Sequence, residues 1–237
     1  MLKYLIIVLL LAGCTQSPVT PRDILLGAKD GSVRILTEDG KPNGSGFITT
    51  TPAGRLVVIT NDHVCDGLKT HQLLLHSLAD LGLRAFKSDP ILFDQEKDLC
   101  AFPLHPAFRL VTKALRISSS PLSQYDRVFI VGYPAMRELS VQEGLVLAEV
   151  EEEVAGIDTG RCQGRREPSF FGMICIQMQT LIQTSTPTIG GNSGSPALNE
   201  EGEVIGVYNS GDTMTSYGNY IKLEALKEFL GAVDQNG

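Results

Sequence analysis

The sequence has few cysteines, no long apolar run and no excess of positive charge. Five cysteines among 237 residues are far below the density of a disulfide-scaffold protein. No apolar run reaches the roughly 18 residues of an ordinary membrane-spanning helix. Lys and Arg together number 20 against 27 for Asp and Glu, and this acidic balance argues against a nucleic-acid partner, which selects for a basic stripe. Internal repeats, low-complexity segments and a phosphate-binding glycine loop are also missing.

The first fourteen residues have the form of an export signal. Lys3 stands before the apolar stretch Tyr4–Leu11, which is too short to cross a membrane as a helix. This stretch runs into Leu11-Ala12-Gly13-Cys14, which resembles the lipobox of bacterial lipoproteins, whose cysteine is acylated and becomes the new N-terminus. The resemblance implies a signal peptide over residues 1–13 and a membrane anchor at Cys14. A plain signal peptide that happens to contain a cysteine is the alternative.

Residues 14–24 are predicted to form the lipidated end of the mature chain and a tether. Thr15–Arg22 is rich in Ser, Thr and Pro, the composition of a linker. Several acyl chains hold a protein on a membrane stably, whereas one chain binds only marginally. Thr15, in place of an aspartate after the cysteine, resembles an outer-membrane sorting signal. We therefore expect a protein of the bacterial cell envelope, on the outer membrane facing the periplasm in preference to the inner membrane.

Export leaves an even set of four cysteines in an oxidising compartment, which favours disulfides. Cys162 and Cys175 are 13 positions apart and suit the two arms of a loop. Cys65 and Cys100 then remain to pair with each other. Four cysteines allow three connectivities, and the alternative for Cys65 and Cys100 is that both are small buried residues.

The body of the chain has the pattern of β structure, with short apolar runs separated by Gly, Pro, Asn and Asp. Residues 37–44 contain the hairpin signals Asp39-Gly40 and Asn43-Gly44. Helical apolar spacing is found in Leu73–Leu83 and in Tyr220–Val233, the expected C-terminal helix. The predicted strands are Ser32–Leu36, Phe47–Thr50, Leu56–Thr60, Ala85–Lys87, Ile91–Phe93, Leu99–Leu104, Arg127–Val131, Leu145–Val150, Met173–Gln179 and Val204–Asn209.

Three short motifs carry candidate chemistry. In residues 188–196, glycines surround Ser193 and permit the tight turn that exposes a nucleophilic hydroxyl and gathers backbone N–H groups. His63 follows the strand Leu56–Thr60 through two polar residues. Asp98 opens the apolar run Leu99–Leu104, a costly place for a charge unless the charge is paired, and Asp94 is the alternative acid. Each motif taken singly also suits a solvated surface loop.

Together the three motifs resemble the trypsin/chymotrypsin superfamily of serine proteases. They match its G-x-S-G-[GS]-P, T-A-A-H and D-x-x-x-D-L-A-L patterns, and the order His63, Asp98, Ser193 is the order of that superfamily. The spelling around Ser193 is closest to the bacterial glutamyl endopeptidases, and Gly44–Ile48 looks like the family's G-x-G-F strand. The resemblance implies an all-β fold of two packed antiparallel β-barrels with a C-terminal helix. The protease unit would cover residues 25–237, with the barrels over about 25–118 and 119–219 and the helix over about 220–233.

The resemblance also implies a serine endopeptidase that takes protein or peptide substrates through an acyl-enzyme. Ser193 would attack the scissile carbonyl, His63 would carry the proton, and Asp98 would orient the imidazole. The backbone N–H groups of Gly191 and Ser193 would form the oxyanion hole. No cofactor is implied, the histidine spacing suggests no metal site, and the oligomeric state stays open.

Departures from the family pattern bear on activation and specificity. Asn192 replaces the aspartate that pairs with a new N-terminal amine in zymogen-activated relatives, so we expect no proteolytic activation. Pro187 replaces the pocket aspartate of trypsin-type members. Thr188 matches a threonine of the glutamyl endopeptidase pocket, but Tyr208 stands in place of their pocket histidine. A small or neutral polar residue before the scissile bond is therefore expected.

Two functions without catalysis are the alternatives. One is a catalytically silent trypsin-like fold that binds peptides as an envelope lipoprotein. The other is a lipoprotein with a structural part in the envelope. The intact set of His63, Asp98 and Ser193, with its flanking glycines, favours the enzyme.

Overall fold

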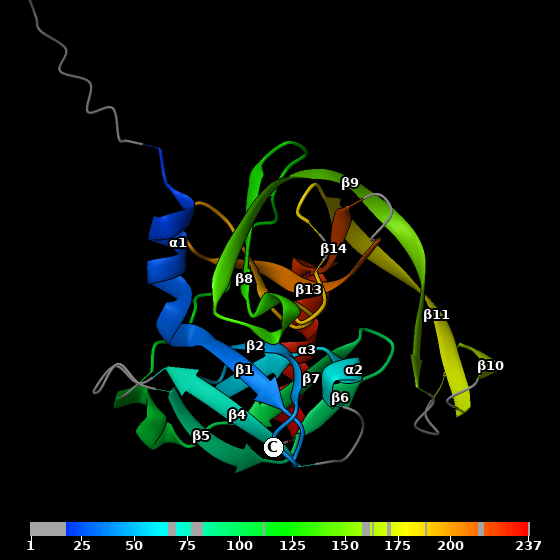
Figure 1. The fold of residues 1–237 in the computed structure, drawn as a ribbon, viewed down its shortest axis with the longest axis horizontal. Coiled ribbons are helices and arrows are strands. Elements are labelled where there is room, and N and C mark those ends of the chain that lie inside the picture. Colours follow the sequence, from blue (N-terminus) through cyan, green and yellow to red (C-terminus); the bar gives the residue numbers. More distant parts are fainter. Residues whose placement is uncertain are drawn as a thin grey trace, which may run out of the picture.

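The computed structural model describes residues 18–65, 70–76, 83–110, 112–157, 162, 164–169, 172–187, 189–212 and 216–236. These residues fold into two curled antiparallel β-sheets, with one helix beside them near the N-terminus and another at the C-terminus (Figure 1). The predicted all-β fold of two packed antiparallel units is confirmed. Cys14 and the rest of the predicted signal lie outside the described residues.

The first sheet has seven strands in the order β5-β4-β1-β2-β3-β7-β6. It is curled into an open barrel, with β5 and β6 as its edges, around buried aliphatic and aromatic side chains such as Ile48, Val58 and Phe102. Its strands are β1 (Ser32–Leu36), β2 (Pro42–Thr50), β3 (Leu56–Thr60), β4 (His71–His76), β5 (Leu83–Ser88), β6 (Leu92–Asp94) and β7 (Leu99–Pro103).

The second sheet has seven strands in the order β10-β11-β14-β13-β12-β8-β9, and an additional pairing of β11 with β9 closes it into a ring that leaves out only β10. This closure is possible because β9 is long enough to pair with β8 at one end and β11 at the other. The strands are β8 (Arg127–Gly132), β9 (Ser140–Ile157), β10 (Arg165–Ser169), β11 (Gly172–Thr184), β12 (Pro196–Leu198), β13 (Val204–Asp212) and β14 (Tyr217–Lys222).

One apolar cluster joins the two sheets. Phe47 and Leu99 from the first sheet pack in the same cluster as Phe129 and Val207 from the second, together with Phe229 of the C-terminal helix. Removal of this much apolar surface from water is the main force that holds the barrels together. The strand ends that carry the candidate catalytic residues therefore meet at a rigid junction.

The C-terminal helix, α3, covers Leu223–Asn236 and not the predicted Tyr220–Val233. Tyr220 belongs to β14, where it pairs with Ile182 of β11, because the barrel needs this strand to close. The prediction of a tether over residues 14–24 was also wrong in part, since Pro21–Ala28 forms the helix α1. Thr20 and Asp23 make a reciprocal capping box at its start, a signal that the Ser/Thr/Pro composition concealed.

Two further local predictions were wrong. The expected helix over Leu73–Leu83 is absent from its described part, where residues up to His76 belong to β4 and Leu83 begins β5; residues 77–82 lie outside the described residues. Burial of Leu73 and Leu75 follows the period of two of a strand. The Asn43-Gly44 hairpin signal lies within β2, whereas Gly40 has the positive φ of a turn.

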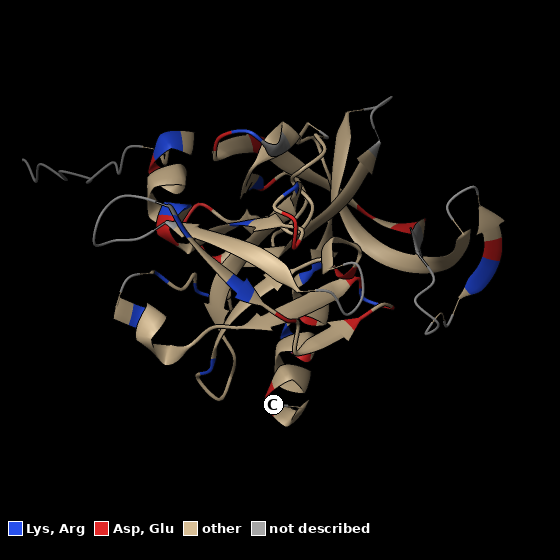
Figure 2. Cartoon of the chain, turned by 60° about the horizontal axis from the view of Figure 1, so that its bottom comes forward, with Lys and Arg blue, Asp and Glu red and all other residues tan. Residues whose placement is uncertain are grey.

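Beyond the ring, the paired ends of β9 and β11 project from the body with β10 beside them, and we call this projection the β9–β11 arm (residues 151–157, 165–169 and 172–180; Figure 1). The predicted Cys162–Cys175 disulfide is confirmed here, with Cα atoms 5.4 Å apart. Basic and acidic residues are interspersed over the described elements (Figure 2). No helix among the described residues is long and apolar enough to cross a membrane.

Candidate active site

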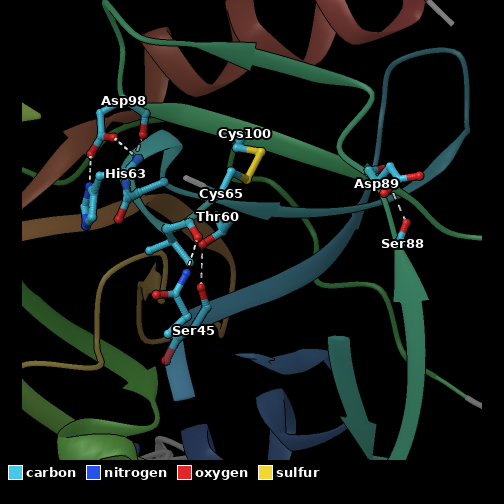
Figure 3. Close-up of a disulfide and its surroundings, with 11 residues drawn as sticks. Ser45, Thr60, His63, Cys65, Ser88, Asp89, Asp98 and Cys100 are labelled. Atoms are coloured by element: carbon cyan, nitrogen blue, oxygen red, sulfur yellow. Dashed lines mark hydrogen bonds and ion pairs between the residues drawn. A yellow bond between two sulfur atoms is a disulfide. The ribbon is translucent and has the colours of Figure 1, made fainter. Parts of the chain in front are cut away.

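His63 and Asp98 are in direct contact through two hydrogen bonds. Nδ1 of His63 lies 2.7 Å from Oδ2 of Asp98, and the backbone N–H of His63 donates to Oδ1 at 2.9 Å (Figure 3). The His63 side chain is 37% exposed, while that of Asp98 is 8% exposed. Since Nδ1 is engaged by the carboxylate, Nε2 is the ring nitrogen left to exchange a proton with a substrate or a hydroxyl.

Four effects act on the imidazole of His63. Its partial burial opposes protonation, whereas the negative charge of Asp98, the hydrogen bond to it and the charge of Asp62 favour protonation. The net result raises the pKa of His63 above its ordinary value. This is the electrostatic setting of a general base that must hold a proton during the reaction.

Asp98 is held in an unusual backbone conformation. Its φ is +51°, in the left-handed region that a residue with a Cβ rarely adopts. The side-chain amide of Asn61 donates to the Asp98 carbonyl at 3.1 Å, and Asn61 is completely buried. Asn61 occupies one of the two positions that depart from the family's T-A-A-H pattern. The residue found there therefore holds the backbone of the candidate acid, Asp98, in place.

The Cys65–Cys100 disulfide ties the same two segments together (Figure 3). Cys65 ends the short helix α2 (Asp62–Cys65), which carries His63, and Cys100 lies on β7 two residues after Asp98. Their Cα atoms are 6.5 Å apart and both cysteines are fully buried. The predicted pairing is confirmed, and it links the candidate base to the candidate acid covalently.

Ser193 lies on a tight turn in front of β12. Gly191 and Gly194, on either side of it, have φ values of +97° and +84°, which favour glycine. A side chain at position 194 would collide with Thr60 and the carbonyl of Ser45, so the turn fits directly against the first barrel. Asp94, the alternative acid, instead pairs with Lys97 at 3.1 Å.

The oxyanion-hole candidates are the N–H groups of Gly191 and Ser193. Within the part of the chain that the structure describes, neither N–H has a hydrogen-bond acceptor, whereas the neighbouring N–H of Asn192 reaches the carbonyl of Ile189 at 3.3 Å. Two unengaged N–H groups flanking the Ser193 turn could serve an anionic oxygen.

Asn209 connects these residues across the two barrels. The Ser193 hydroxyl donates to its carbonyl at 3.3 Å, and its side-chain amide donates to Oδ2 of Asp98 at 3.0 Å. The same amide lies 3.2 Å from Oε1 of Gln179, whose own amide donates to the carbonyl of Glu96 at 3.0 Å. Sequence reasoning missed Asn209 and Gln179, because no motif marks a buried amide that acts between distant strands.

The comparisons with known proteins agree with this geometry. Residues 44–207, more than half of the chain, match the trypsin-like peptidase domain.

The chain belongs to the trypsin-like peptidase domain family.

Among curated relatives, it is 26% identical to the serine protease Do-like HtrA of Bacillus subtilis over 83% of the chain, which is 39% of that protein. It is 28% identical to the mitochondrial serine protease HTRA2 of Drosophila persimilis over 88% of the chain and 46% of that protein. It is 31% identical to the chloroplastic Protease Do-like 5 of Arabidopsis thaliana over 76% of the chain and 52% of that protein. The chain thus spans about half or less of the length of these relatives.

Solved structures share the fold. The active form of the Rv3671c protease of M. tuberculosis superposes with a TM-score of 0.69 and 17% identity over 94% of both chains. The serine endoprotease of Yersinia pestis superposes with a TM-score of 0.68 and 17% identity over 94% of this chain and 69% of that one. At this level of identity the structural similarity establishes the chymotrypsin-like fold alone, so the chemistry must be argued from the residues of this chain.

Within this trypsin-like domain, Asn192 has a neutral partner. Its side-chain amide donates to Oε1 of Gln142 on β9 at 2.6 Å, and Asn192 is 1% exposed. Members that are activated by cleavage place an aspartate here and need a positive charge opposite it. The neutral Asn192 side chain cannot form such an ion pair; its NH2 donates to Gln142, while its own Oδ1 has no hydrogen-bond partner among the described residues.

Of the two pocket candidates, Tyr208 is described and Thr188 lies outside the described residues. Tyr208 is 2% exposed and packs with Ile130, Ala197 and Tyr220. A Cβ at Gly218 would lie 2.8 Å from the Tyr208 ring, so the missing side chain at position 218 makes room for the ring. Groups of three or more metal-ligating side chains are absent from the described residues.

Proposed function

We propose that the protein is a membrane-anchored serine endopeptidase in which His63, Asp98 and Ser193 form the catalytic triad. The single observation that carries the proposal is the bonded set of His63, Asp98, Asn209 and Ser193, drawn from both barrels. The match of residues 44–207 to the trypsin-like peptidase domain supports the same reading, because resemblance to this family implies a His-Asp-Ser triad. The substrate class is protein or peptide.

The reaction begins with attack of Ser193 Oγ on the carbonyl carbon of the scissile bond. The hydroxyl proton passes to Nε2 of His63 as the C–O bond forms, and the carbonyl oxygen becomes an anion held by the N–H groups of Gly191 and Ser193. Asp98 stabilises the imidazolium and keeps Nδ1 protonated. His63 then gives its proton to the leaving amine as the C–N bond breaks, which leaves an acyl-enzyme.

A water molecule completes the cycle. His63 removes a proton from the water, whose oxygen attacks the acyl carbon, and the new anion again lies against the Gly191 and Ser193 N–H groups. Return of the proton to Ser193 Oγ breaks the ester and releases a carboxylic acid product. The Ser193 hydroxyl, which donates to Asn209 in the free enzyme, must turn toward His63 for attack.

Specificity follows from the residues around the proposed pocket. Pro187 offers no charge for an Arg or Lys side chain, and the buried Tyr208 ring lies directly beside Gly218, where it leaves no room for a Cβ. We infer a preference for a small or neutral polar residue before the scissile bond. A cleavage profile over a peptide library tests it, and a strong preference for Arg, Lys or Glu at that position would contradict it.

The mature protein is expected to be active without cleavage, because the neutral Asn192 cannot form the ion pair that cleavage-activated relatives need and instead donates to Gln142. A protein that stays inactive until it is cut near residues 23–29 would contradict this expectation. For the anchor, the Leu-Ala-Gly-Cys sequence ending at Cys14 supports lipidation in the bacterial envelope, with the outer membrane favoured.

The decisive experiment is labelling of the purified full-length protein with a fluorophosphonate probe, beside fluorescent casein as a general substrate. Wild type should be labelled and active, and Ser193→Ala should lose both properties. Ser195→Ala is the matched control, because this serine lies two residues away and is fully buried. An unlabelled wild-type protein would favour the alternative of a silent, peptide-binding fold.

A further inference from the structure

Ser45 on β2 uses all of its polar groups on residues that lie far from it in the sequence. Its N–H donates to the carbonyl of Ser193 at 2.9 Å, and its hydroxyl donates to the carbonyl of Gly191 at 2.6 Å. The hydroxyl oxygen also accepts the N–H of Tyr133 at 3.0 Å. Its carbonyl accepts the Thr60 hydroxyl at 2.6 Å (Figure 3). Ser45 is 0% exposed, so water cannot replace these bonds.

These contacts join the elements that bear the base and the nucleophile. Thr60 ends β3 just before His63, while Gly191 and Ser193 belong to the nucleophile turn of the other barrel. Tyr133 follows β8 of the second barrel. One small side chain therefore lies where three segments converge, and a shift of any of them would break one of its bonds.

The nucleophile turn has three successive carbonyls that are all engaged. The Gly190 carbonyl accepts the N–H of Ala135 at 2.6 Å, the Gly191 carbonyl accepts the Ser45 hydroxyl, and the Asn192 carbonyl accepts the N–H of Ser195 at 2.8 Å. The peptide bonds are trans, so each N–H points opposite to the carbonyl of its own peptide unit. The bonds to the Gly190 and Asn192 carbonyls thereby set the directions of the Gly191 and Ser193 N–H groups, and the Gly191 carbonyl that Ser45 holds belongs to the peptide unit between them.

Two adjacent glycines make this support necessary. Gly190 and Gly191 lack a Cβ, so the peptide unit before Gly191 and the unit after it, which bears the carbonyl that Ser45 holds, turn relative to each other at little steric cost. The Gly191 carbonyl lies between the two peptide units that bear the proposed oxyanion donors. A rotation that freed it would change the backbone angles on which both N–H directions depend.

We propose that the Ser45 hydroxyl is a positioning group that holds the oxyanion hole in its working orientation. This inference rests on the proposed peptidase function. Ser45 touches no reacting atom, and its effect passes through the Gly191 carbonyl. The negative charge on the substrate's scissile carbonyl oxygen develops only during attack. Ser45 should therefore affect stabilisation of the transition state and not substrate binding.

The test compares Ser45→Ala with wild type in the full-length protein, using p-nitrophenyl acetate as the acylating probe and fluorescent casein as the peptide substrate. Loss of an oxyanion donor typically costs on the order of 10²–10³ in kcat. Ser45→Ala keeps both donors and loosens their orientation, so we expect kcat to fall about 10- to 100-fold with KM changed by less than about twofold. Ser45→Thr keeps the hydroxyl and should restore most of kcat.

Ser32→Ala is the matched control. Ser32 is 1% exposed, lies on β1 of the same barrel, and donates its hydroxyl to the carbonyl of Ala28 at 3.1 Å. Its loss removes one buried hydrogen bond far from the nucleophile turn, whereas Ser45→Ala removes two. The proposal predicts a fall in Tm for both variants, somewhat larger for Ser45→Ala, with a large fall in kcat for Ser45→Ala alone.

Each result decides between separate claims. If Ser193→Ala abolishes acylation while Ser45→Ala leaves kcat unchanged, the peptidase function stands and the Ser45 proposal is overturned. A rise in KM at constant kcat, or an equal loss of kcat in Ser32→Ala, would also overturn it. If Ser193→Ala still releases an acylation burst, the peptidase proposal itself fails. Should Ser45→Ala not fold, Ser45→Cys replaces it, and an unchanged kcat in that variant counts against the proposal.

Discussion

Asn209 of the second barrel donates its side-chain amide to Oδ2 of Asp98 in the first barrel at 3.0 Å. The acid of the proposed triad is thus held from both barrels, since His63 and Asp98 belong to the first. Gln179 holds the Asn209 amide from the other side at 3.2 Å. This chain of amides ties the β9–β11 arm, which carries Gln179, to the catalytic carboxylate.

Replacement of Asn209 should impair catalysis more than folding. Asn209→Ala removes a hydrogen bond to an ionised carboxylate, and such bonds contribute about 1.5–3 kcal/mol. We expect kcat to fall about tenfold or more in the casein assay. Asn219→Ala is the matched control, because Asn219 is 2% exposed and donates to Glu152 at 2.8 Å. Equal losses of kcat in both variants would show that Asn209 matters only for packing.

The activity should depend on pH through His63. A general base works when it is neutral, so kcat/KM is expected to rise with pH, with a midpoint above about 6.5, because Asp98 raises the pKa of His63. In Asp98→Asn the charge is lost, so the midpoint should fall and kcat should drop by a factor on the order of 10⁴. A pH–rate profile of both proteins measures this, and an unchanged midpoint in Asp98→Asn would refute the assignment.

The His63–Asp98 pair should also affect the stability of the fold, and this contribution decreases as the pH rises. Since the folded-state pKa of His63 is raised, the protonated pair stabilises the fold below the unfolded-state pKa, and this contribution is lost as the pH rises through the folded-state pKa. Thermal unfolding of wild type and Asp98→Asn at acidic and alkaline pH separates this effect from activity.

The two disulfides should differ in what they protect. Cys65–Cys100 closes 35 residues and Cys162–Cys175 closes 13, which in the chain-entropy model stabilise by about 4 and about 3 kcal/mol. Replacing either pair by alanine should lower Tm by about 10 °C. Only loss of Cys65–Cys100 should also lower kcat at a temperature where both variants are folded. Equal kcat values would show that this disulfide does not align His63 with Asp98.

The Tyr208 ring should set the size limit of the proposed specificity pocket. Tyr208→Val removes the ring that lies beside Gly218, so we expect cleavage after larger apolar residues, measured with a peptide library. Tyr208→Phe keeps the ring and should retain the wild-type profile. A profile that is identical in all three proteins would place the determinant elsewhere.

The proposed lipid anchor at Cys14 predicts in which cell fraction the protein is found. Cys14→Ser removes the thiol that would be acylated, so the protein should move from the membrane pellet to the soluble fraction when it is expressed in a bacterium. Wild type should incorporate a labelled fatty acid and the variant should not. Recovery of unlabelled wild-type protein in the soluble fraction would support the plain signal peptide instead.

Much of the fold could be predicted because the relevant signals are local. Ser32–Leu36 and Leu56–Thr60 are strands with the predicted bounds, since alternation and apolar runs reflect burial directly. The described ends of Leu73–Leu83 are strands and not the expected helix, because a short apolar run fits both, and only pairing with β1 and β5 decides. The strand Tyr217–Lys222 was not predicted, and its last three residues were assigned to the C-terminal helix. Its pairing with β11 and β13 on either side makes it a strand.

The sequence by itself determined the trypsin-like fold and the candidate residues His63, Asp98 and Ser193, because each lies in a motif whose neighbours in the chain create its local geometry. It favoured the two disulfide pairs but left their connectivity open, and the structure decided it. Only the tertiary structure revealed the hydrogen-bonding roles of Ser45, Asn61, Gln179 and Asn209. Their partners lie between 30 and 146 positions away, in Gly191, Asp98 and Asn209. A hydrogen bond of that kind depends on the packing of one barrel against the other or of strands within a barrel, and no local pattern specifies it.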